Sequence, residues 1–322
     1  MRTISAKEIA AGLTPSKVAD VLEAAFRAEI NTPIRHHHTI ERPDSERATL
    51  LLMPAWHEGS ATGTPTYIGI KIVSVFPHNA RRSAPTIMGT YLLLSGTTGE
   101  VKATLDGPTI TSWRTAAASA LASRFLSRKD SKKLTMIGAG SLAPYLVKAH
   151  VAERPITEIT IWNREPDMAT NMAEHLRAFY KDEKTVAATT DLEQAVRGAD
   201  IVSSATLAQE PLVKGEWLKD GAHVDLVGGF TPQMREADDT AIRRAAVFVD
   251  TRGGACHEAG DIVQPLKNGV IQMSDIRADL FDLCRGKHAG RAAANDITLF
   301  KSVGTALEDL ALAAYVADNL KA

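Results

Sequence analysis

The chain has 322 residues, which predicts two domains at about 150 residues each. Its hydrophobic content of 44% is typical of a folded protein. A formal net charge of -1, with basic and acidic residues interspersed, leaves no basic stripe that could bind nucleic acid. Two cysteines cannot form a disulfide framework, and the first residues hold no apolar run typical of a signal peptide or membrane span. We therefore expect a soluble, cytoplasmic protein.

The N-terminal third is rich in expected strands. A helix is expected over residues 15–30, followed by strands at 48–56 and 66–76. Residues 86–106 are typical of a hairpin that turns at SGTTGE. This part of the chain is therefore expected to be a β-rich region joined by loops.

From residue 109 onward, expected helices alternate with expected strands as far as AVFVDT at 246–251. Such alternation predicts an α/β fold with a doubly wound parallel sheet and helices on both faces. The final stretch, VGTALEDLALAAYVADNL, is an amphipathic helix with no sheet partner of its own. The fold class is thus a Rossmann-type α/β domain accompanied by a β-rich α+β domain.

The stretch LTMIGAGSLAPYLV, at residues 134–147, runs from an expected strand through two glycines into an expected helix. This context fits a dinucleotide-binding turn: Gly138 permits the tight bend, Gly140 lets the pyrophosphate approach, and Ala143 allows close packing. The alternative is a strand-to-helix turn that binds nothing. The expected cofactor-binding residues of this turn are Gly138, Ala139, Gly140, Ser141 and Leu142.

The choice of dinucleotide depends on the end of the next strand, EITIWNREPD. An acidic residue there would bind the ribose 2′-hydroxyl of NADH. Asn163 and Arg164 come first, and a polar residue followed by Arg suits the 2′-phosphate of NADPH. We therefore expect NADPH; NADH remains the alternative if Glu165 contacts the ribose.

Three cations outside this motif call for an explanation. Lys71 interrupts the apolar strand GIKIVSVF, and a buried ammonium is costly without an anion. Arg114 is expected in the first turn of a helix beginning near Thr111, where the macrodipole disfavours cations. Together with Arg35, a loop residue, they could form a clamp for a carboxylate ligand. The alternatives are salt-bridged or solvated side chains.

The motifs PIR, IKIV, APTIM, SWRTAAASALA, IGAGSLA, WNR, VGGFTP and FKSVGTALEDL, in this order, resemble the ornithine cyclodeaminase/mu-crystallin family over nearly the whole chain. The resemblance implies a substrate-binding and dimerisation domain of residues 1–112 and 300–322, with a homodimer as the assembly. It also implies that residues 113–299 form an inserted Rossmann domain.

The resemblance also implies roles for single residues. Arg35, Lys71 and Arg114 would bind the substrate carboxylate, with Thr86 nearby. Asn163 and Arg164 resemble the family's NADP-selecting pair. Further positions that the family places near cofactor or substrate are Thr115, Ala205, Thr206 and Ser302.

One position departs from the cyclodeaminase pattern. Where those enzymes carry an Asp after the paired glycines, this chain has Phe230, which cannot act as a general base. The sequence GGFTPQMRE is similar to that of the family's cyclic-imine reductases, which reduce Δ1-pyrroline-2-carboxylate to L-proline and often Δ1-piperideine-2-carboxylate to L-pipecolate. We therefore expect such a reductase, whose substrate arrives already protonated or takes its proton from Lys71 or water.

Two rival functions stay open. A lyase of the family, a 3-hydroxyproline dehydratase or an ornithine cyclodeaminase, could use His37 or Asp225 in place of the missing acid. A non-catalytic protein could instead hold NADPH and a small acid. No metal is expected, because three adjacent histidines at 36–38 cannot all face one ion from a single strand.

Overall fold

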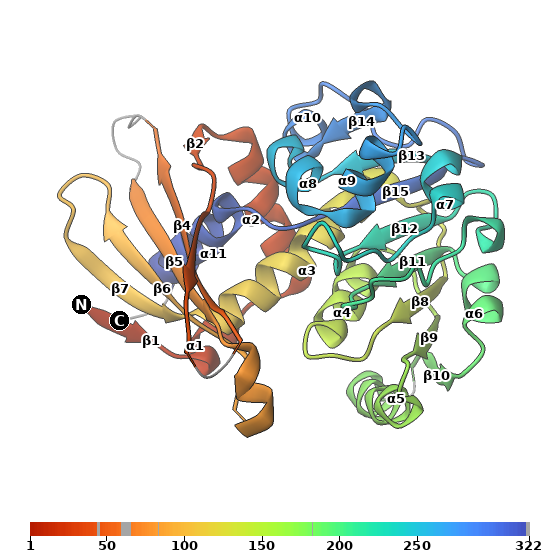
Figure 1. The fold of residues 1–322 in the computed structure, drawn as a ribbon, viewed down its shortest axis with the longest axis horizontal. Coiled ribbons are helices and arrows are strands. Elements are labelled where there is room, and N and C mark those ends of the chain that lie inside the picture. The colour runs from red at the N-terminus through yellow and green to blue at the C-terminus, as the bar shows by residue number, and fades with distance from the viewer. Residues whose placement is uncertain (44–45, 59–65, 83, 182, 320–322) are drawn as a thin grey trace. The chain divides into compact units, whose positions relative to one another are not determined.

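The computed structural model describes the chain except for residues 44–45, 59–65, 83, 182 and 320–322, and it divides into two compact units (Figure 1). Unit 1 comprises Met1–Arg114 and Thr305–Ala322, and unit 2 comprises Thr115–Gly304. Unit 1 is therefore discontinuous in sequence, because its last helix follows the whole of unit 2.

Unit 1 contains a seven-stranded sheet in the order β1-β7-β6-β5-β4-β2, with β3 also paired to β4. β1 runs parallel to β7, and the other pairs are antiparallel. The hairpin expected over residues 86–106 is confirmed as β6 and β7. The strands are β1 (Arg2–Ile4), β2 (Ile30–Asn31), β3 (His36–Ile40), β4 (Ala48–His57), β5 (Tyr67–Val75), β6 (Ile87–Ser95) and β7 (Val101–Asp106).

One face of this sheet is covered by a helix that also packs against a second helix. Helix α11 (Ala306–Asn319) contacts β4, β5, β6 and helix α2 (Pro15–Arg27). The packing is close at Gly69, where a Cβ atom would overlap the Tyr91 hydroxyl and lie 3.0 Å from a methyl group of Leu310. The shorter elements α1 (Ala6–Ala10) and η1 (Pro77–Arg82) complete the unit.

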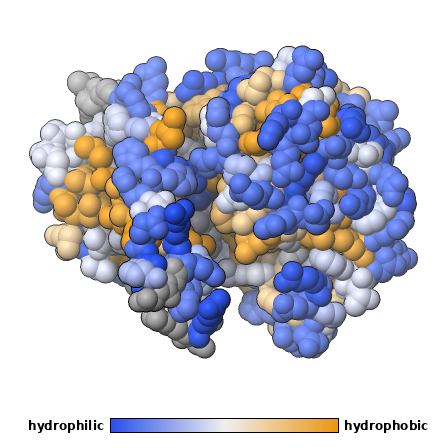
Figure 2. Space-filling view, in the orientation of Figure 1, coloured by the Kyte–Doolittle hydropathy of each residue, from blue (hydrophilic) through white to orange (hydrophobic). Residues whose placement is uncertain are grey.

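The opposite face of the sheet is apolar and partly exposed. Along a strand, side chains alternate between the two faces of the sheet. Lys71 is buried on the side of α11, so Ile70 and Ile72, which flank it along β5, point away from that helix. Figure 2 shows apolar side chains gathered over the strands of this unit. The residues of this apolar face are Leu52, Pro54, Trp56, Ile68, Ile70, Ile72, Leu92 and Leu94.

Unit 2 contains eight parallel strands in the order β10-β9-β8-β11-β12-β15-β13-β14. The strand order reverses between β8 and β11, which is the switch point where such sheets bind dinucleotides. The strands are β8 (Lys133–Ile137), β9 (Glu158–Trp162), β10 (Thr185–Thr189), β11 (Ile201–Ser204), β12 (His223–Leu226), β13 (Ala245–Val249), β14 (Ile276–Asp279) and β15 (Ile297–Lys301).

Helices lie on both faces of the unit 2 sheet (Figure 1). The predicted fold class, a doubly wound α/β sheet beside a β-rich region, is confirmed. The helices are α3 (Gly107–Leu126), which begins in unit 1, α4 (Ala143–Glu153), α5 (Pro166–Tyr180), α6 (Leu192–Gly198), α7 (Asp239–Arg244), α8 (Arg252–Glu258), α9 (Gly260–Lys267) and α10 (Leu280–Cys284), with the 3₁₀ turns η2 (Gly215–Trp217) and η3 (Met273–Asp275).

Helix α3 begins earlier than the sequence analysis expected. Its first residue is Gly107, because the Asp106 carboxylate accepts a hydrogen bond from the Thr109 N–H (2.9 Å) and Pro108 suits the first turn. Arg114 therefore lies about two turns inside the helix. Its expected place in the first turn was wrong, and the macrodipole does not explain its environment.

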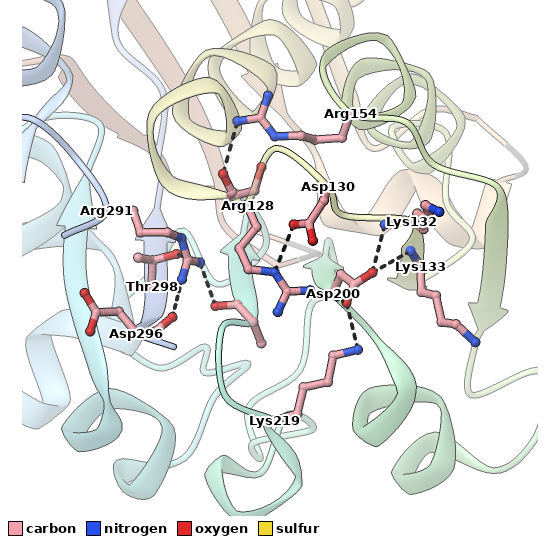
Figure 3. Close-up of polar contacts among 12 residues, drawn as sticks. Arg128, Asp130, Lys132, Lys133, Arg154, Asp200, Lys219, Arg291, Asp296 and Thr298 are labelled. Carbon is pink, nitrogen blue, oxygen red and sulfur yellow. Dashed lines mark hydrogen bonds and ion pairs between the residues drawn. The ribbon is translucent and has the colours of Figure 1, made fainter. Parts of the chain in front are cut away.

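Arginines from elsewhere in unit 2 donate hydrogen bonds to the last carbonyl groups of α3, and Figure 3 shows Arg154 beside this end of the helix. The Arg154 guanidinium donates to the carbonyl oxygens of Ser123 (2.6 Å) and Arg124 (2.9 Å). Arg291 donates to that of Leu126 (2.7 Å). The last carbonyl groups of a helix have no intrahelical partners, so these guanidinium groups cap the carboxyl end of α3.

Asp200 organises the same edge of the sheet (Figure 3). Its carboxylate accepts hydrogen bonds from the backbone N–H groups of Lys132 (2.8 Å) and Lys133 (3.0 Å), just where β8 begins. It also pairs with Arg128 and Lys219, each at 2.8 Å. The basic residues gathered at this edge therefore have structural partners.

We predict that Arg154→Met lowers the free energy of unfolding by roughly 1–3 kcal/mol, because it removes the hydrogen bonds that Arg154 donates to the carbonyl oxygens of Ser123, Arg124 and Ser127. Urea denaturation followed by circular dichroism would measure the change. Arg197→Met removes an exposed ion pair with Glu193 and serves as a control that should alter stability little. Equal effects of the two substitutions would contradict the capping role.

Candidate functional site

Unit 2 has a groove of about 710 Å³ at the carboxyl ends of β8, β9 and β11. It gathers predicted cofactor residues from both sides of the switch point of the sheet. Those that line it are Gly138, Ala139, Gly140, Asn163, Arg164, Ala205 and Thr206, together with Trp162, Glu165, Met168, Leu207, Ala208, Gln209, Glu210 and Leu212.

The glycine-rich turn is shaped to receive an anion. Gly138 has a φ of +101°, and a Cβ atom there would lie 2.7 Å from the Ala205 carbonyl oxygen. A Cβ atom at Gly140 would meet open space. Within the described part of the chain, the N–H groups of Gly140, Ser141 and Leu142 donate no hydrogen bond. Free N–H groups before a helix are typical of a pyrophosphate site.

Asn163 and Arg164 have different environments. The Asn163 side chain accepts a hydrogen bond from the Ala139 N–H (3.2 Å) and donates to the Glu165 carbonyl (3.1 Å), so it fixes the turn. Arg164 is exposed on the groove, and among the described residues it forms no ion pair. Its guanidinium is therefore available to an anionic ligand.

Thr115 and Ser302 lie outside the groove lining, and both are buried. The backbone N–H of Ser302 donates to the Leu226 carbonyl (3.2 Å). Its hydroxyl has no hydrogen-bond partner among the residues that the structure describes. A buried hydroxyl without a partner is costly, which is consistent with contact to a ligand.

In unit 1, the strand register places Met53, Lys71 and Tyr91 in one row across β4, β5 and β6. All three side chains are buried beneath α11. Arg35 immediately precedes His36, which pairs with Leu52, so Arg35 extends the same row. The sheet thus aligns two of the three predicted clamp cations.

Acidic residues of α11 pair with these cations. The Lys71 ammonium lies 2.8–2.9 Å from the two carboxylate oxygens of Asp309. Arg114 donates to Asp309 (3.1 Å) and Glu308 (2.7 Å), and both carboxylates are fully buried. For Lys71 and Arg114, the structure therefore contains the salt bridges named as an alternative in the sequence analysis. Their binding of a further carboxylate stays a prediction.

The pKa of the Lys71 ammonium is lowered from 10.5 to about 8. Burial is the largest cause, followed by the positive charge of Arg114. Asp309 opposes the shift, and Arg35 adds to it, which places Arg35 within electrostatic reach of Lys71. An amine that loses its proton near pH 8 is suited to proton transfer at physiological pH.

Thr86 precedes β6 by one residue, and its carbonyl accepts a hydrogen bond from the Phe76 N–H (2.7 Å). It lies five residues before Tyr91, the partner of Lys71, and its side chain forms no hydrogen bond within the described part of the chain. The structure therefore brings Arg35, Lys71 and Arg114 together but does not place Thr86 beside them.

The residues proposed for lyase chemistry are poorly placed for it. Asp225 is fully buried and accepts hydrogen bonds from Ser119 (3.0 Å) and Ser203 (2.8 Å), and it pairs with His150 (3.0 Å). Burial acts to raise the pKa of its carboxyl, but the hydrogen bond and charge of His150, with a smaller contribution from Ser203, hold this pKa below the usual value. His37 is exposed on β3.

The described residues contain no group of three or more His, Cys, Asp or Glu side chains positioned to hold a metal ion. They also include no helix with both the length and the apolar character needed to cross a membrane.

Sequence reasoning missed Glu308 and Asp309 as functional candidates. The available signal was their position: two acids stand between Leu307 and Leu310 in a helix whose surrounding residues are apolar. Acidic residues at core positions are rare unless they are paired. Together with the unexplained Lys71, they indicate a buried ion pair.

Comparisons with known proteins agree with this geometry. The model of the ornithine cyclodeaminase/mu-crystallin family matches residues 2–322. A Δ1-pyrroline-2-carboxylate reductase of Paracoccus denitrificans is 40% identical over 270 residues, which cover 84% of this chain and 83% of the relative.

Two solved structures are similar over almost the whole chain. The Δ1-pyrroline-2-carboxylate reductase of Thermococcus litoralis, in complex with NADH and L-proline, has a TM-score of 0.91 and 32% identity, covering 99% of this chain and 97% of that one. An archaeal alanine dehydrogenase dimer with bound NAD has a TM-score of 0.87 and 28% identity, covering 99% and 95%.

The lowered pKa of Lys71 predicts a pH-dependent stability. Between pH 8 and 10.5 the unfolded chain holds the Lys71 proton and the folded chain does not, so rising pH favours the folded state. Relative to that of Lys71→Met, the free energy of unfolding of the native protein should rise by roughly 3 kcal/mol between pH 8 and pH 10.5. Urea denaturation at several pH values would measure it; a difference independent of pH would contradict the lowered pKa.

Proposed function

This chain belongs to the ornithine cyclodeaminase/mu-crystallin family, and we propose that it reduces a cyclic imine carboxylate with a nicotinamide cofactor. The proposed reaction converts Δ1-pyrroline-2-carboxylate to L-proline, and the six-membered Δ1-piperideine-2-carboxylate to L-pipecolate. The observation that carries the proposal is the similarity, over 99% of the chain, to a structure of such a reductase with NADH and L-proline. We place the reaction in the cytoplasm.

The described residues fit a dinucleotide. The free N–H groups of Gly140, Ser141 and Leu142 would bind the pyrophosphate, and Ala205 and Thr206 would line the path of the cofactor. The reduced nicotinamide supplies the hydride that the imine carbon accepts. Thr115 and Ser302 complete the proposed cofactor set.

Arg164 favours NADPH in this proposal. Its guanidinium faces the groove without an ion-pair partner in the described part of the chain, and Arg binds phosphate groups in a bidentate manner. The neighbouring Glu165 would repel a 2′-phosphate but could accept a hydrogen bond from a ribose hydroxyl. NADH is the bound cofactor in the similar Thermococcus structure, so NADH use is compatible with this fold.

The clamp of Arg35, Lys71 and Arg114 would bind the substrate carboxylate. Asp309 and Glu308 neutralise two of the cations before substrate arrives, so the buried site carries no large excess charge. Lys71 would then donate its proton to the imine nitrogen, since an ammonium with a pKa of about 8 loses a proton readily near neutral pH. Thr86 completes the proposed substrate-binding set.

A homodimer is part of the proposal. The apolar face of the unit 1 sheet is contiguous over three strands, and a large exposed apolar surface usually marks a protein interface. The similar archaeal alanine dehydrogenase is a dimer. A second copy of the chain is therefore the partner that we propose for this face.

The first experiment measures nicotinamide oxidation by the purified protein with Δ1-pyrroline-2-carboxylate, using NADPH and NADH in parallel. We expect turnover with a preference for NADPH. Lys71→Met should lower kcat at saturating substrate by about 10²-fold or more, as expected for loss of a general acid. If only KM rises, Lys71 binds substrate but does not donate the proton. Without turnover by any imine, a lyase or a non-catalytic binding protein replaces this proposal.

A second experiment tests the cofactor preference. Arg164→Ser removes the proposed contact to the 2′-phosphate, so it should weaken NADPH binding about 10- to 150-fold and leave NADH binding nearly unchanged, because a charged hydrogen bond is worth roughly 1.5–3 kcal/mol. Fluorescence titration of each cofactor measures the two dissociation constants. An equal change for both cofactors would refute the selective role.

A further inference from the structure

Three charged side chains are fully buried behind the groove of unit 2. Glu236 follows the β12 strand, Asp261 lies in α9, and Lys301 ends β15. The Lys301 ammonium lies 3.1 Å from an Asp261 carboxylate oxygen and 4.0 Å from Glu236 Oε2. Neither the nucleotide fingerprint nor the carboxylate clamp includes these residues, so their presence requires another explanation.

Glu236 holds the segment that follows β11. Its Oε1 atom accepts hydrogen bonds from the Ser204 hydroxyl (2.6 Å), the Thr206 N–H (2.7 Å) and the Thr206 hydroxyl (2.8 Å). One carboxyl oxygen therefore fixes both the backbone and the side chain of Thr206, a residue of the groove lining.

Lys301 and Asp261 tie the neighbouring strand ends to the same point. Lys301 donates a hydrogen bond to the carbonyl oxygen of Gly228, just beyond β12. Asp261 accepts from the backbone N–H groups of Glu236 (2.8 Å) and Ala237 (2.9 Å). A Cβ atom at Gly228 would lie 2.7 Å from the Glu236 carboxyl carbon, so only glycine permits this approach. The cluster thus joins the carboxyl ends of β11, β12 and β15.

The charges of the cluster do not balance if both acids are ionised, because two carboxylates would face one ammonium. Glu236 Oε2 has no hydrogen-bond partner among the described residues. Burial and the nearby Asp261 raise the pKa of the Glu236 carboxyl, against the opposing effect of Lys301. A neutral side chain at position 236 whose Oε1 atom still accepts these hydrogen bonds would therefore preserve the contacts of the cluster.

The location of the cluster indicates which part of a dinucleotide it serves. A doubly wound sheet binds the two mononucleotide halves on either side of its switch point. The fingerprint turn and Arg164 lie at the ends of β8 and β9, on the adenosine side. The cluster lies at the ends of β11, β12 and β15, on the opposite side.

We propose that Glu236, Asp261 and Lys301 are positioning residues that fix the Thr206 segment for the nicotinamide half of the cofactor. This inference rests on the proposed nicotinamide function. It assigns no contact with substrate to the cluster, which acts through Thr206 and the backbone of Gly228.

The test compares the binding of NADPH with that of 2′-phospho-ADP-ribose, which lacks only the nicotinamide. Glu236→Asp shortens the side chain by one methylene, so the three hydrogen bonds to Oε1 cannot all persist. We expect the dissociation constant of NADPH to rise roughly tenfold, and that of 2′-phospho-ADP-ribose to change less than about twofold. Glu236→Gln keeps the acceptor and should stay within about threefold of the native protein for both ligands.

The matched control is Asp200→Asn, which alters a buried carboxylate at the amino edge of the same sheet and should change neither dissociation constant. If Glu236→Asp does not fold, Ser204→Ala can replace it, because it removes one of the three hydrogen-bond donors to Glu236. It should raise the dissociation constant of NADPH about threefold and leave that of 2′-phospho-ADP-ribose nearly unchanged. Equal weakening of both ligands, or unchanged NADPH binding by a folded variant, would overturn the inference.

These measurements are independent of imine turnover. Selective loss of NADPH binding in a protein that reduces no imine would support the positioning role and reject the proposed reaction. Normal imine reduction by Glu236→Asp, with unchanged NADPH binding, would support the proposed reaction and reject the positioning role.

Discussion

Unit 1 depends on the pairing of buried cations with buried acids. Lys71 comes from the middle of a sheet, Arg114 from α3, and their partners Asp309 and Glu308 from the last helix of the chain. Each charge alone would be too costly to bury, and removing one member leaves another without compensation. The interaction therefore fixes α11 to the sheet and, at the same time, holds two cationic groups where the proposed substrate carboxylate would bind.

The parallel sheet of unit 2 uses polar groups differently at its two edges. At the amino edge, Arg154, Arg291 and Asp200 satisfy helix and strand ends, and these groups have no need of a ligand (Figure 3). At the carboxyl edge, the N–H groups of the fingerprint turn and the Ser302 hydroxyl lack protein partners within the described residues. The direction of the strands thus separates the edge that stabilises the fold from the edge that can bind a cofactor.

The sequence allowed the family, the fold class and a nicotinamide cofactor to be predicted, and all three are confirmed. Local patterns sufficed for the glycine turn and the hairpin, because neighbouring residues determine both. The start of α3 was predicted too late in the chain, because the Asp106 cap and Pro108, and not the helical run from Thr111, determine its first turn. The acids at 308 and 309 were missed because their partners lie 194 to 238 residues away, and only the folded chain shows such pairs.

The discontinuity of unit 1 also has a consequence for biosynthesis. Its N-terminal sheet leaves the ribosome long before α11, which supplies both carboxylates for Lys71 and Arg114. The ion pairs of Lys71 with Asp309 and of Arg114 with Glu308 therefore form only after α11 has been synthesised. Unit 2 is contiguous in sequence and needs no later segment. Unit 2 is therefore synthesised whole before α11, which completes the buried ion pairs of unit 1.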